Sequence, residues 1–421
     1  MGLQYMKVLH SNAERSEAIT LFPDRQITVD ILIKSIGDQS PHPVLSPPRF
    51  EVLNALSKAI LKDAALTKLA PWTALAYWLR RSAVTRLASD FDKRLPQGTI
   101  AAPRGCAVHL PPQNVDTIFI YSWAISFLMG NLNIVRLPAR LGAHTKTAIV
   151  HLQAALADRG LEESNLFVQY PSESDVNRAL FSIADLRFIW GGDAKIRALS
   201  VVPAKPNCLT LPFSDRFSFS ILDCQAYDRA NETERDALAA SMFFDVYQFD
   251  QMACSSTRLI FWLGSQKEAA KENTKDLSQR LVVQAASRAY AIAPQTRMEK
   301  FAASNRAAID LGVERVHDSS PHVTSVELCD LPDIREIKPG AGFLFFKHVN
   351  NASEIAAFVR RKDQTVTHFG FDADALKRIA SELLVSGVDR LVPVGSALNF
   401  DVIWDGFDLM AQSSRLVKVQ V

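Results

Sequence analysis

The chain has 421 residues, roughly three times the usual size of one domain, which predicts two or three lobes with large cores. Hydrophobic residues make up 48% and charged residues 22%, a globular balance that excludes disordered, collagen-like and fibrous chains. The 47 basic and 45 acidic residues give a net charge of +2, so no global field is available to hold a nucleic acid.

The longest apolar run, residues 117–129, is about 13 residues long, short of the ~20 that a membrane span needs. We therefore expect a buried helix there and no membrane span. The N-terminus lacks the apolar core of a signal peptide, so we expect a cytoplasmic protein. Five cysteines without a CxxC pair, and histidines without HExxH or HxH, argue against a disulfide framework and against a structural metal.

The first 99 residues are interpreted as a helical entry region. A strand-like stretch at 27–34 and a proline-rich linker at 41–48 precede two helical patterns, at 50–68 and 72–91, with apolar residues three and four apart.

From Cys106 onward, short β-prone runs alternate with helix-length amphipathic stretches. This rhythm predicts a doubly wound α/β lobe over 100–224, with ligands at the carboxyl ends of parallel strands. The rhythm restarts with FSFSILD and predicts a second α/β lobe over 225–395. The segment 396–421 ends in the alternating pattern RLVKVQV, which could be an edge strand or could pair with another subunit.

The common nucleotide and hydrolase signatures are missing, because the sequence contains no GxGxxG, no GxxxxGK[ST] and no GxSxG. One cysteine has an unusual setting: Cys254 lies in a small polar turn with Ser255 and Ser256, just before a β-prone run. A thiol at such a strand entrance could be a nucleophile. Composition alone favours the other interpretation, a small buried hydrophobic residue.

Four blocks in order carry a resemblance to a known family. The stretch DVYQFDQMACSSTR (245–258) resembles the active-site segment of the LuxC-like fatty acyl-CoA reductases, members of the aldehyde dehydrogenase superfamily. PRGCAVHLPPQNVD (103–116), GNLNIVRLPAR (130–140) and FIWGGDAKIRAL (188–199) are similar to three further superfamily segments, and the similarity runs from about residue 100 to 421. The resemblance implies an aldehyde-dehydrogenase-like fold of two doubly wound α/β lobes with an active-site cleft between them.

The resemblance also implies the chemistry. Cys254 would attack an acyl thioester, from acyl-CoA or an acyl-carrier protein, and hydride from NADPH would reduce the acyl-enzyme to an aldehyde. Asn114 would aim its amide, together with the Cys254 backbone N–H, at the oxygen that becomes an anion. The alternative for Asn114 is that it only caps a helix starting near Asp116.

Three residues are expected at the cofactor. Arg136 stands where the superfamily usually has a lysine near the adenosine ribose, and its guanidinium fork suits a 2′-phosphate, which favours NADPH over NADH. Its alternative is a solvated strand-end cation. Gly191 and Gly192 follow a strand and open a helix, so a pyrophosphate could approach the backbone there. Their alternative is a helix-opening turn without a ligand.

One departure from the hydrolytic aldehyde dehydrogenases is informative. Those enzymes carry a glutamate that activates water, whereas this chain offers PFSDR (212–216) and has no glutamate between Glu173 and Glu232. We therefore expect an acyl-enzyme that waits for hydride. Arg258 is interpreted as a strand-end arginine that bonds carbonyls. Glu336 lies roughly where the superfamily contacts the nicotinamide ribose, but the surrounding pattern differs.

Two other functions stay open at this point. The same cysteine could serve an acyltransferase that uses no nicotinamide, or the chain could be a non-catalytic subunit of an acyl reductase complex. LuxC-like proteins associate with an acyl-protein synthetase, so such a synthetase is an expected partner, beside a possible homo-oligomer.

Overall fold

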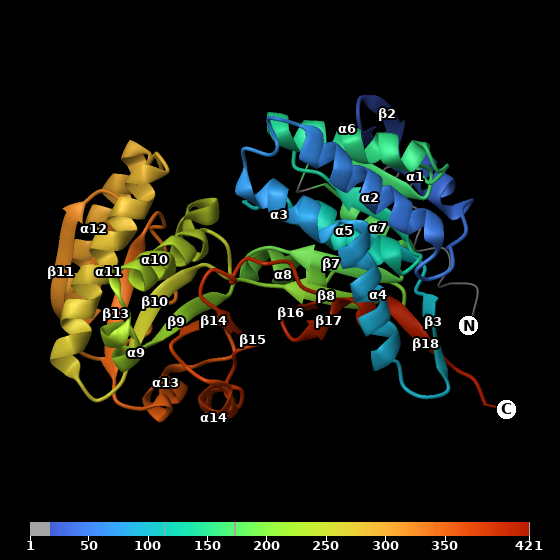
Figure 1. Ribbon diagram of the computed structural model, residues 1–421. Helices are drawn as coiled ribbons and strands as arrows, with labels where there is room; N and C mark the ends of the chain where they lie inside the picture. Colours follow the sequence, from blue (N-terminus) through green and yellow to red (C-terminus); the bar gives the residue numbers. More distant parts are fainter. Residues whose placement is uncertain (1–16, 113, 172–173, 421) are drawn as a thin grey trace. The chain divides into compact units, whose positions relative to one another are not determined.

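The computed structural model describes residues 17–112, 114–171 and 174–420 and divides into two compact units (Figure 1). The first unit takes the described residues up to Ser214, together with Phe400–Ile403 and the residues from Phe407 onward. The second unit is Asp215–Asn399 with Trp404–Gly406. Within the residues described, no helix combines the length and apolar character that a membrane crossing requires.

The first unit is built on a seven-stranded sheet in the order β2-β1-β6-β5-β4-β7-β8. The five strands β6, β5, β4, β7 and β8 are parallel, and β1 pairs antiparallel with both β2 and β6. Their bounds are β1 Ala18–Leu21, β2 Arg25–Thr28, β4 Cys106–Leu110, β5 Leu132–Arg136, β6 Asn165–Gln169, β7 Leu186–Trp190 and β8 Leu209–Phe213.

Helices pack on this sheet, and the most apolar of them is fully enclosed. Every residue of α5 (Ile118–Leu128) is buried, because β4 and β5 cover one side of it and α2 another, which confirms the predicted buried helix. The unit's helices are α1 Val29–Gly37, α2 Pro47–Lys62, α3 Ala70–Trp78, α4 Arg81–Arg94, α5, α6 Ala143–Ala157, α7 Val176–Ile183, α8 Asp193–Ser200 and α15 Leu409–Gln412.

The strand expected at 27–34 is wrong beyond Thr28. The chain turns there into helix α1, because the Thr28 hydroxyl accepts the Ile31 N–H as an N-cap and Asp30 stands in the positive first turn. The apolar residues Val29, Leu32 and Ile36 then share one buried helix face.

The end of the chain also belongs to the first unit. Strand β18 (Ser414–Lys418) pairs antiparallel with β3 (Thr99–Pro103), and Figure 1 shows the two side by side. The terminal pattern is therefore a strand, paired within the chain. The short strands β16 (Ile403–Trp404) and β17 (Phe407–Asp408) lie where the chain passes from one unit to the other.

The second unit has its own seven-stranded sheet, in the order β11-β12-β13-β10-β9-β14-β15. All neighbours are parallel except β11, which pairs antiparallel with β12. The strands are β9 Phe217–Asp223, β10 Thr257–Leu263, β11 Val313–Ser320, β12 Val323–Leu328, β13 Phe343–Val349, β14 Asp363–Phe369 and β15 Arg390–Pro393. The helices are α9 Cys224–Arg229, α10 Glu232–Tyr247, α11 Lys267–Ser287, α12 Pro294–Asp310, α13 Ala352–Phe358 and α14 Ala373–Leu383.

Both faces of this second sheet are buried. Along β10, Leu259 and Phe261 join the core cluster that includes Phe358 of α13, whereas Ile260 and Trp262 join the opposite cluster under α10 and α11. This is the two-residue alternation of a strand covered on both sides, which explains the continuous apolar run in the sequence. The two parallel sheets confirm the predicted α/β class.

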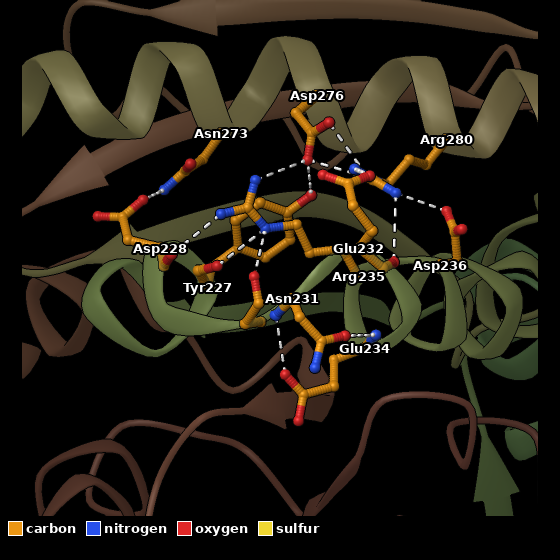
Figure 2. Close-up of polar contacts among 11 residues, drawn as sticks. Tyr227, Asp228, Asn231, Glu232, Glu234, Arg235, Asp236, Asn273, Asp276 and Arg280 are labelled. Atoms are coloured by element: carbon orange, nitrogen blue, oxygen red, sulfur yellow. Dashed lines mark hydrogen bonds and ion pairs between the residues drawn. The ribbon is translucent and has the colours of Figure 1, made fainter.

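A network of charges joins the helices on one face of the second unit (Figure 2). The Arg280 guanidinium of α11 binds Glu232 and Asp236 of α10, both at 2.6 Å. Asp276 accepts a hydrogen bond from Arg280 Nε at 3.0 Å and another from the Tyr227 hydroxyl at 2.6 Å. Because several charges share these contacts, the network stabilises the helix pair more than an isolated surface ion pair would. It anchors α10, the helix that leads into the cysteine loop.

Candidate active site

The loop before Cys254 has a strained backbone. After α10, a short 3-10 turn covers residues 248–251, and within it Phe249, Asp250 and Gln251 have φ angles of 56°, 53° and 63°. Each non-glycine residue in this left-handed region costs about 1–2 kcal/mol, so the conformation must be held by contacts. The Ala253 carbonyl then accepts the Ser256 N–H at 3.0 Å, and β10 begins at Thr257.

Gln251 supplies those contacts. Its buried amide donates to the carbonyls of Thr257, at 2.7 Å, and Phe343, at 3.0 Å. Its Oε1 accepts from the backbone N–H groups of Gly342, at 2.9 Å, and Phe343, at 3.2 Å. One side chain thus ties the cysteine loop to the start of β13 through three hydrogen bonds and to Thr257 of β10 through a fourth.

Cys254 itself is half-buried, and neighbouring strands fix the residues around it. The Ser218 hydroxyl donates to the Cys254 carbonyl at 2.8 Å, and the Ser255 hydroxyl donates to Gln364 Oε1 at 2.9 Å. Burial raises the pKa of the Cys254 thiol, while a hydrogen bond from the Arg216 backbone and the charge of Arg258 act in the opposite direction. The polar environment therefore partly offsets the cost of a buried thiolate.

Arg258 differs from the strand-end arginine expected to bond carbonyls, because one of its guanidinium nitrogens has no partner among the described residues. It lies where the pairing of β10 with β9 shifts register, between Thr257 and Leu259, and such bulges re-aim side chains beside active sites. Its side chain is only 5% exposed, and its Nη1 has no hydrogen-bond partner among the described residues. Burial lowers the Arg258 pKa, and the charges of Cys254 and Asp215 oppose that shift. A buried cation with an unused donor therefore stands within electrostatic reach of the sulfur.

A carboxylate that the sequence reasoning overlooked also lies near the thiol. The segment 212–216 has no glutamate, but it contains Asp215, whose charge acts on Cys254. Asp215 pairs with Lys338 and, at 3.6 Å, with Lys362. No local sequence signal could have found this group, because the two lysines stand far along the chain.

The first unit offers a different kind of site, at a topological switch point. β4 is followed along the chain by β5 on one side, while β7 pairs on its other side, and crevices outside such strand ends bind ligands in doubly wound sheets. Asn114 follows β4 and is exposed. Helix α5 begins at Ile118 with Thr117 as its N-cap residue, so Asn114 does not occupy the N-cap that the alternative interpretation assigned to it.

The predicted glycines follow β7 at the same carboxyl edge. Gly191 has φ of 151°, and a Cβ there would meet the Lys195 side chain at 2.7 Å, so only glycine fits. Gly192 is the N-cap residue of α8 and makes no side-chain cap, and a Cβ there would meet nothing within 4 Å. There is thus open space around the Cβ position of Gly192, where α8 begins.

Arg136 ends β5 and is buried rather than solvated. Its Nη2 donates to the Tyr170 carbonyl at 3.2 Å, its guanidinium lies over the Tyr170 ring, and its Nε has no partner among the described residues. Burial and the Arg136 charge lower the pKa of Lys195, on α8, to about 8. Two cations therefore stand close enough to repel each other at this edge, which is the arrangement that an anionic ligand would relieve.

A pocket of about 330 Å³ opens in the first unit, between the segment after β4 and the segment before α6. Pro111 and Pro112, after β4, form one wall; Arg140 and Gly142, before α6, form another. Gly142 is the N-cap residue of α6 and lacks a side-chain cap, so this helix N-terminus and the exposed Arg140 both favour an anion. The sequence pattern places Arg140 at the end of the 130–140 block but gives no signal that it lines a pocket.

The fold defines the class of protein. A glyceraldehyde-3-phosphate dehydrogenase from Methanocaldococcus jannaschii, solved with NADP, superposes with a TM-score of 0.66 at 12% identity and covers 92% of each chain. An aldehyde dehydrogenase from Physcomitrella patens, solved with succinate, gives 0.63 at 11% identity and covers 92% of this chain and 88% of its own. The chain therefore has the aldehyde dehydrogenase fold, as predicted.

The sequence comparison narrows that class to one family. The profile described as acyl-CoA reductase (LuxC) matches residues 83–416, so the chain belongs to this family, which confirms the resemblance. A long-chain acyl-protein thioester reductase from Photorhabdus luminescens is 26% identical over 337 residues, 77% of this chain and 66% of the relative. The corresponding protein from Aliivibrio fischeri is 23% identical over 312 residues, 72% of this chain and 62% of its own length.

The match to these relatives is partial in length. A long-chain acyl-protein thioester reductase 2 from Photobacterium leiognathi is 29% identical over 180 residues, which span 36% of it and 41% of this chain. The chain thus spans at most about two thirds of these relatives, given the 66% and 62% above.

Proposed function

We propose that the protein reduces a long-chain acyl thioester, acyl-CoA or acyl-protein, to the aldehyde through an acyl-Cys254 intermediate, with NADPH as the reductant. The observation that carries this proposal is Cys254 in a rigid, strained loop beside the buried, partly unpartnered guanidinium of Arg258. Family membership and the names of the relatives support the substrate class.

In the first half of the reaction, the Cys254 thiolate attacks the thioester carbon, and the thiol of the donor leaves with a proton. Arg258 favours the thiolate electrostatically before attack, since a cation lowers the cost of the negative sulfur. We assign the Asn114 amide and the Cys254 backbone N–H as donors to the oxyanion that attack creates.

In the second half, the bound nicotinamide coenzyme supplies the hydride that the acyl carbon requires. The resulting thiohemiacetal is held on Cys254, and its C–S bond breaks to release the aldehyde while the sulfur leaves as a thiolate. Arg258 again offsets the charge on the departing sulfur. The oxyanion donors hold the oxygen until the carbonyl re-forms.

The first unit fits a phosphate-rich coenzyme. The unpartnered Arg136 Nε, the nearby Lys195 and the open N-terminus of α8 at Gly192 all favour negative charge at the carboxyl edge of the sheet. Arg140 adds an exposed cation in the pocket next to α6. A 2′-phosphate gives these cations an additional partner, which supports NADPH over NADH.

Intact-mass spectrometry tests the proposal. Mixing the protein with tetradecanoyl-CoA should add one acyl group to Cys254 and release CoA, and adding NADPH should remove the acyl group and yield tetradecanal. Cys254→Ala is the matched control and should show neither change. A wild-type protein that never acquires the adduct, or that passes the acyl group to an added amine while ignoring NADPH, would contradict the proposed function.

A further inference from the structure

Asp215 lies in the second unit, within electrostatic reach of the nucleophile. It directly precedes Arg216, whose backbone makes a hydrogen bond to the Cys254 thiol, and its own charge acts on both Cys254 and Arg258. Its side chain is 26% exposed, so water reaches it. Asp215 is therefore a partly exposed carboxylate whose charge acts on the sulfur that would carry the acyl group.

A carboxylate in that position could promote an unwanted reaction. Water would attack the carbonyl carbon of acyl-Cys254 while Asp215 takes one of its protons, and the C–S bond would then break. The thiolate would recover the proton, and the products would be a carboxylic acid and the Cys254 thiol, with no change in oxidation state. An active-site base of this kind contributes about 10²–10⁴-fold to such a step.

Two lysine ammonium groups pair with the Asp215 carboxylate. Lys338, from the segment before β13, binds Asp215 Oδ2, and the Lys362 ammonium lies 3.6 Å from the same oxygen. The backbone fixes Lys362 there, because its carbonyl accepts the Phe217 N–H at 3.0 Å where β14 begins beside β9. Lys362 also binds Glu336 at 2.8 Å, which holds its ammonium in place.

These contacts make Asp215 a weak base. Burial alone would raise its pKa, but the hydrogen bond from Lys338 and the charges of Lys338, Lys362 and Arg258 outweigh burial and lower it. A carboxylate whose lone pairs already accept from an ammonium gains little by taking a proton from water.

We propose that Lys338 and Lys362 clamp Asp215 so that the acyl-enzyme is reduced rather than hydrolysed, which makes the two lysines positioning residues that decide between aldehyde and acid. This inference rests on the proposed acyl-Cys254 intermediate. The absence of a glutamate in the segment 174–231 explains only part of the chemistry. Two aspartates, Asp215 and Asp405, act on the thiol. Asp405 is buried, with 5% of its side chain exposed, whereas the two lysines hold the more exposed Asp215.

The test measures how long the acyl-enzyme survives. Wild-type protein and the Lys338→Met/Lys362→Met variant are loaded with tetradecanoyl-CoA, freed of CoA, and followed without coenzyme by intact mass and by release of tetradecanoic acid. We expect the double variant to lose its adduct about tenfold faster or more, with stoichiometric acid. Adding Asp215→Asn to the double variant should restore the wild-type lifetime, and Lys338→Arg/Lys362→Arg should retain it.

The matched control is Lys377→Met on α14, whose ammonium is 78% exposed and should leave the lifetime unchanged. Only protein that has formed the adduct enters the measurement, so misfolded molecules do not contribute. A wild-type lifetime in the double variant, or rapid hydrolysis that persists with Asp215→Asn, would overturn the inference. A wild-type protein that forms no adduct would instead overturn the proposed function, and this inference with it.

Discussion

Gln251 should control both the stability of the second unit and the geometry of the cysteine loop. Gln251→Met keeps a side chain of similar length but removes all four hydrogen bonds that join the loop to Thr257, Gly342 and Phe343. A buried hydrogen bond contributes about 0.5–1.5 kcal/mol net, so the four together are worth about 2–6 kcal/mol. The left-handed backbone at 249–251 would then keep only its other contacts, such as the Ala341 N–H that donates to the Asp250 carbonyl at 3.0 Å.

Two measurements check this expectation. The free energy of unfolding in urea should fall by at least about 2 kcal/mol. Hydrogen exchange should accelerate at the Gly342 amide, whose N–H donates to Gln251 Oε1 at 2.9 Å. The control is Gln295→Met on α12, an exposed glutamine that donates to Glu299 at the surface. Unchanged exchange at Gly342, with a loss of stability no larger than in the control, would refute the reasoning.

Four further changes test the chemistry. Cys254→Ser should abolish aldehyde formation, because a hydroxyl is a far poorer nucleophile than a thiolate at neutral pH; an active serine variant would contradict the mechanism. Arg258→Met should move the midpoint of pH-dependent alkylation of Cys254 upward, since the Arg258 charge lowers the thiol pKa and its loss raises it; an unmoved midpoint would exclude the electrostatic role. Asn114→Ala should slow adduct formation by about 100-fold, measured by mass spectrometry of samples quenched at successive times. An unchanged rate would show that Asn114 is not an oxyanion donor. Arg136→Ala should raise the apparent KM for NADPH by about tenfold or more and leave that for NADH unchanged, because a charge-assisted phosphate contact is worth about 1.5–3 kcal/mol. Equal weakening of both coenzymes would mean that Arg136 only supports Tyr170.

The parallel sheets could be predicted because their pattern is local. Buried parallel strands such as β7 and β10 are continuous apolar runs, and the helices between strands have apolar residues three and four apart. A window of about ten residues is therefore enough to identify each element. The errors arose where a cap overrode composition. β-branched residues after Thr28 favoured a strand, but the threonine cap begins α1. In the second unit, α9 ends at Arg229 and a separate helix, α10, begins at Glu232, because Asn231 and Glu234 form a capping box there.

In the candidate site, too, local patterns could be predicted from the sequence and long-range contacts could not. Cys254 was found because its neighbours form a contiguous motif. The groups that set its chemistry come from other strands: Lys338 meets Asp215 across 123 residues of sequence, and a one-dimensional pattern carries no information about such a pairing. The unused donor of Arg258 depends on the register shift in β10, which only the folded sheet reveals.

Because the chain returns to the first unit at its end, the unit that is synthesised first is completed last. Residues 215–399 and 404–406 make up the second unit, so nearly all of that unit has left the ribosome before the residues from Phe407 onward appear. Strand β3, by contrast, waits for β18, its partner from the far end of the chain. During translation the second unit can therefore finish folding while the first still exposes an unpaired strand edge, and such an edge is open to aggregation or to a chaperone.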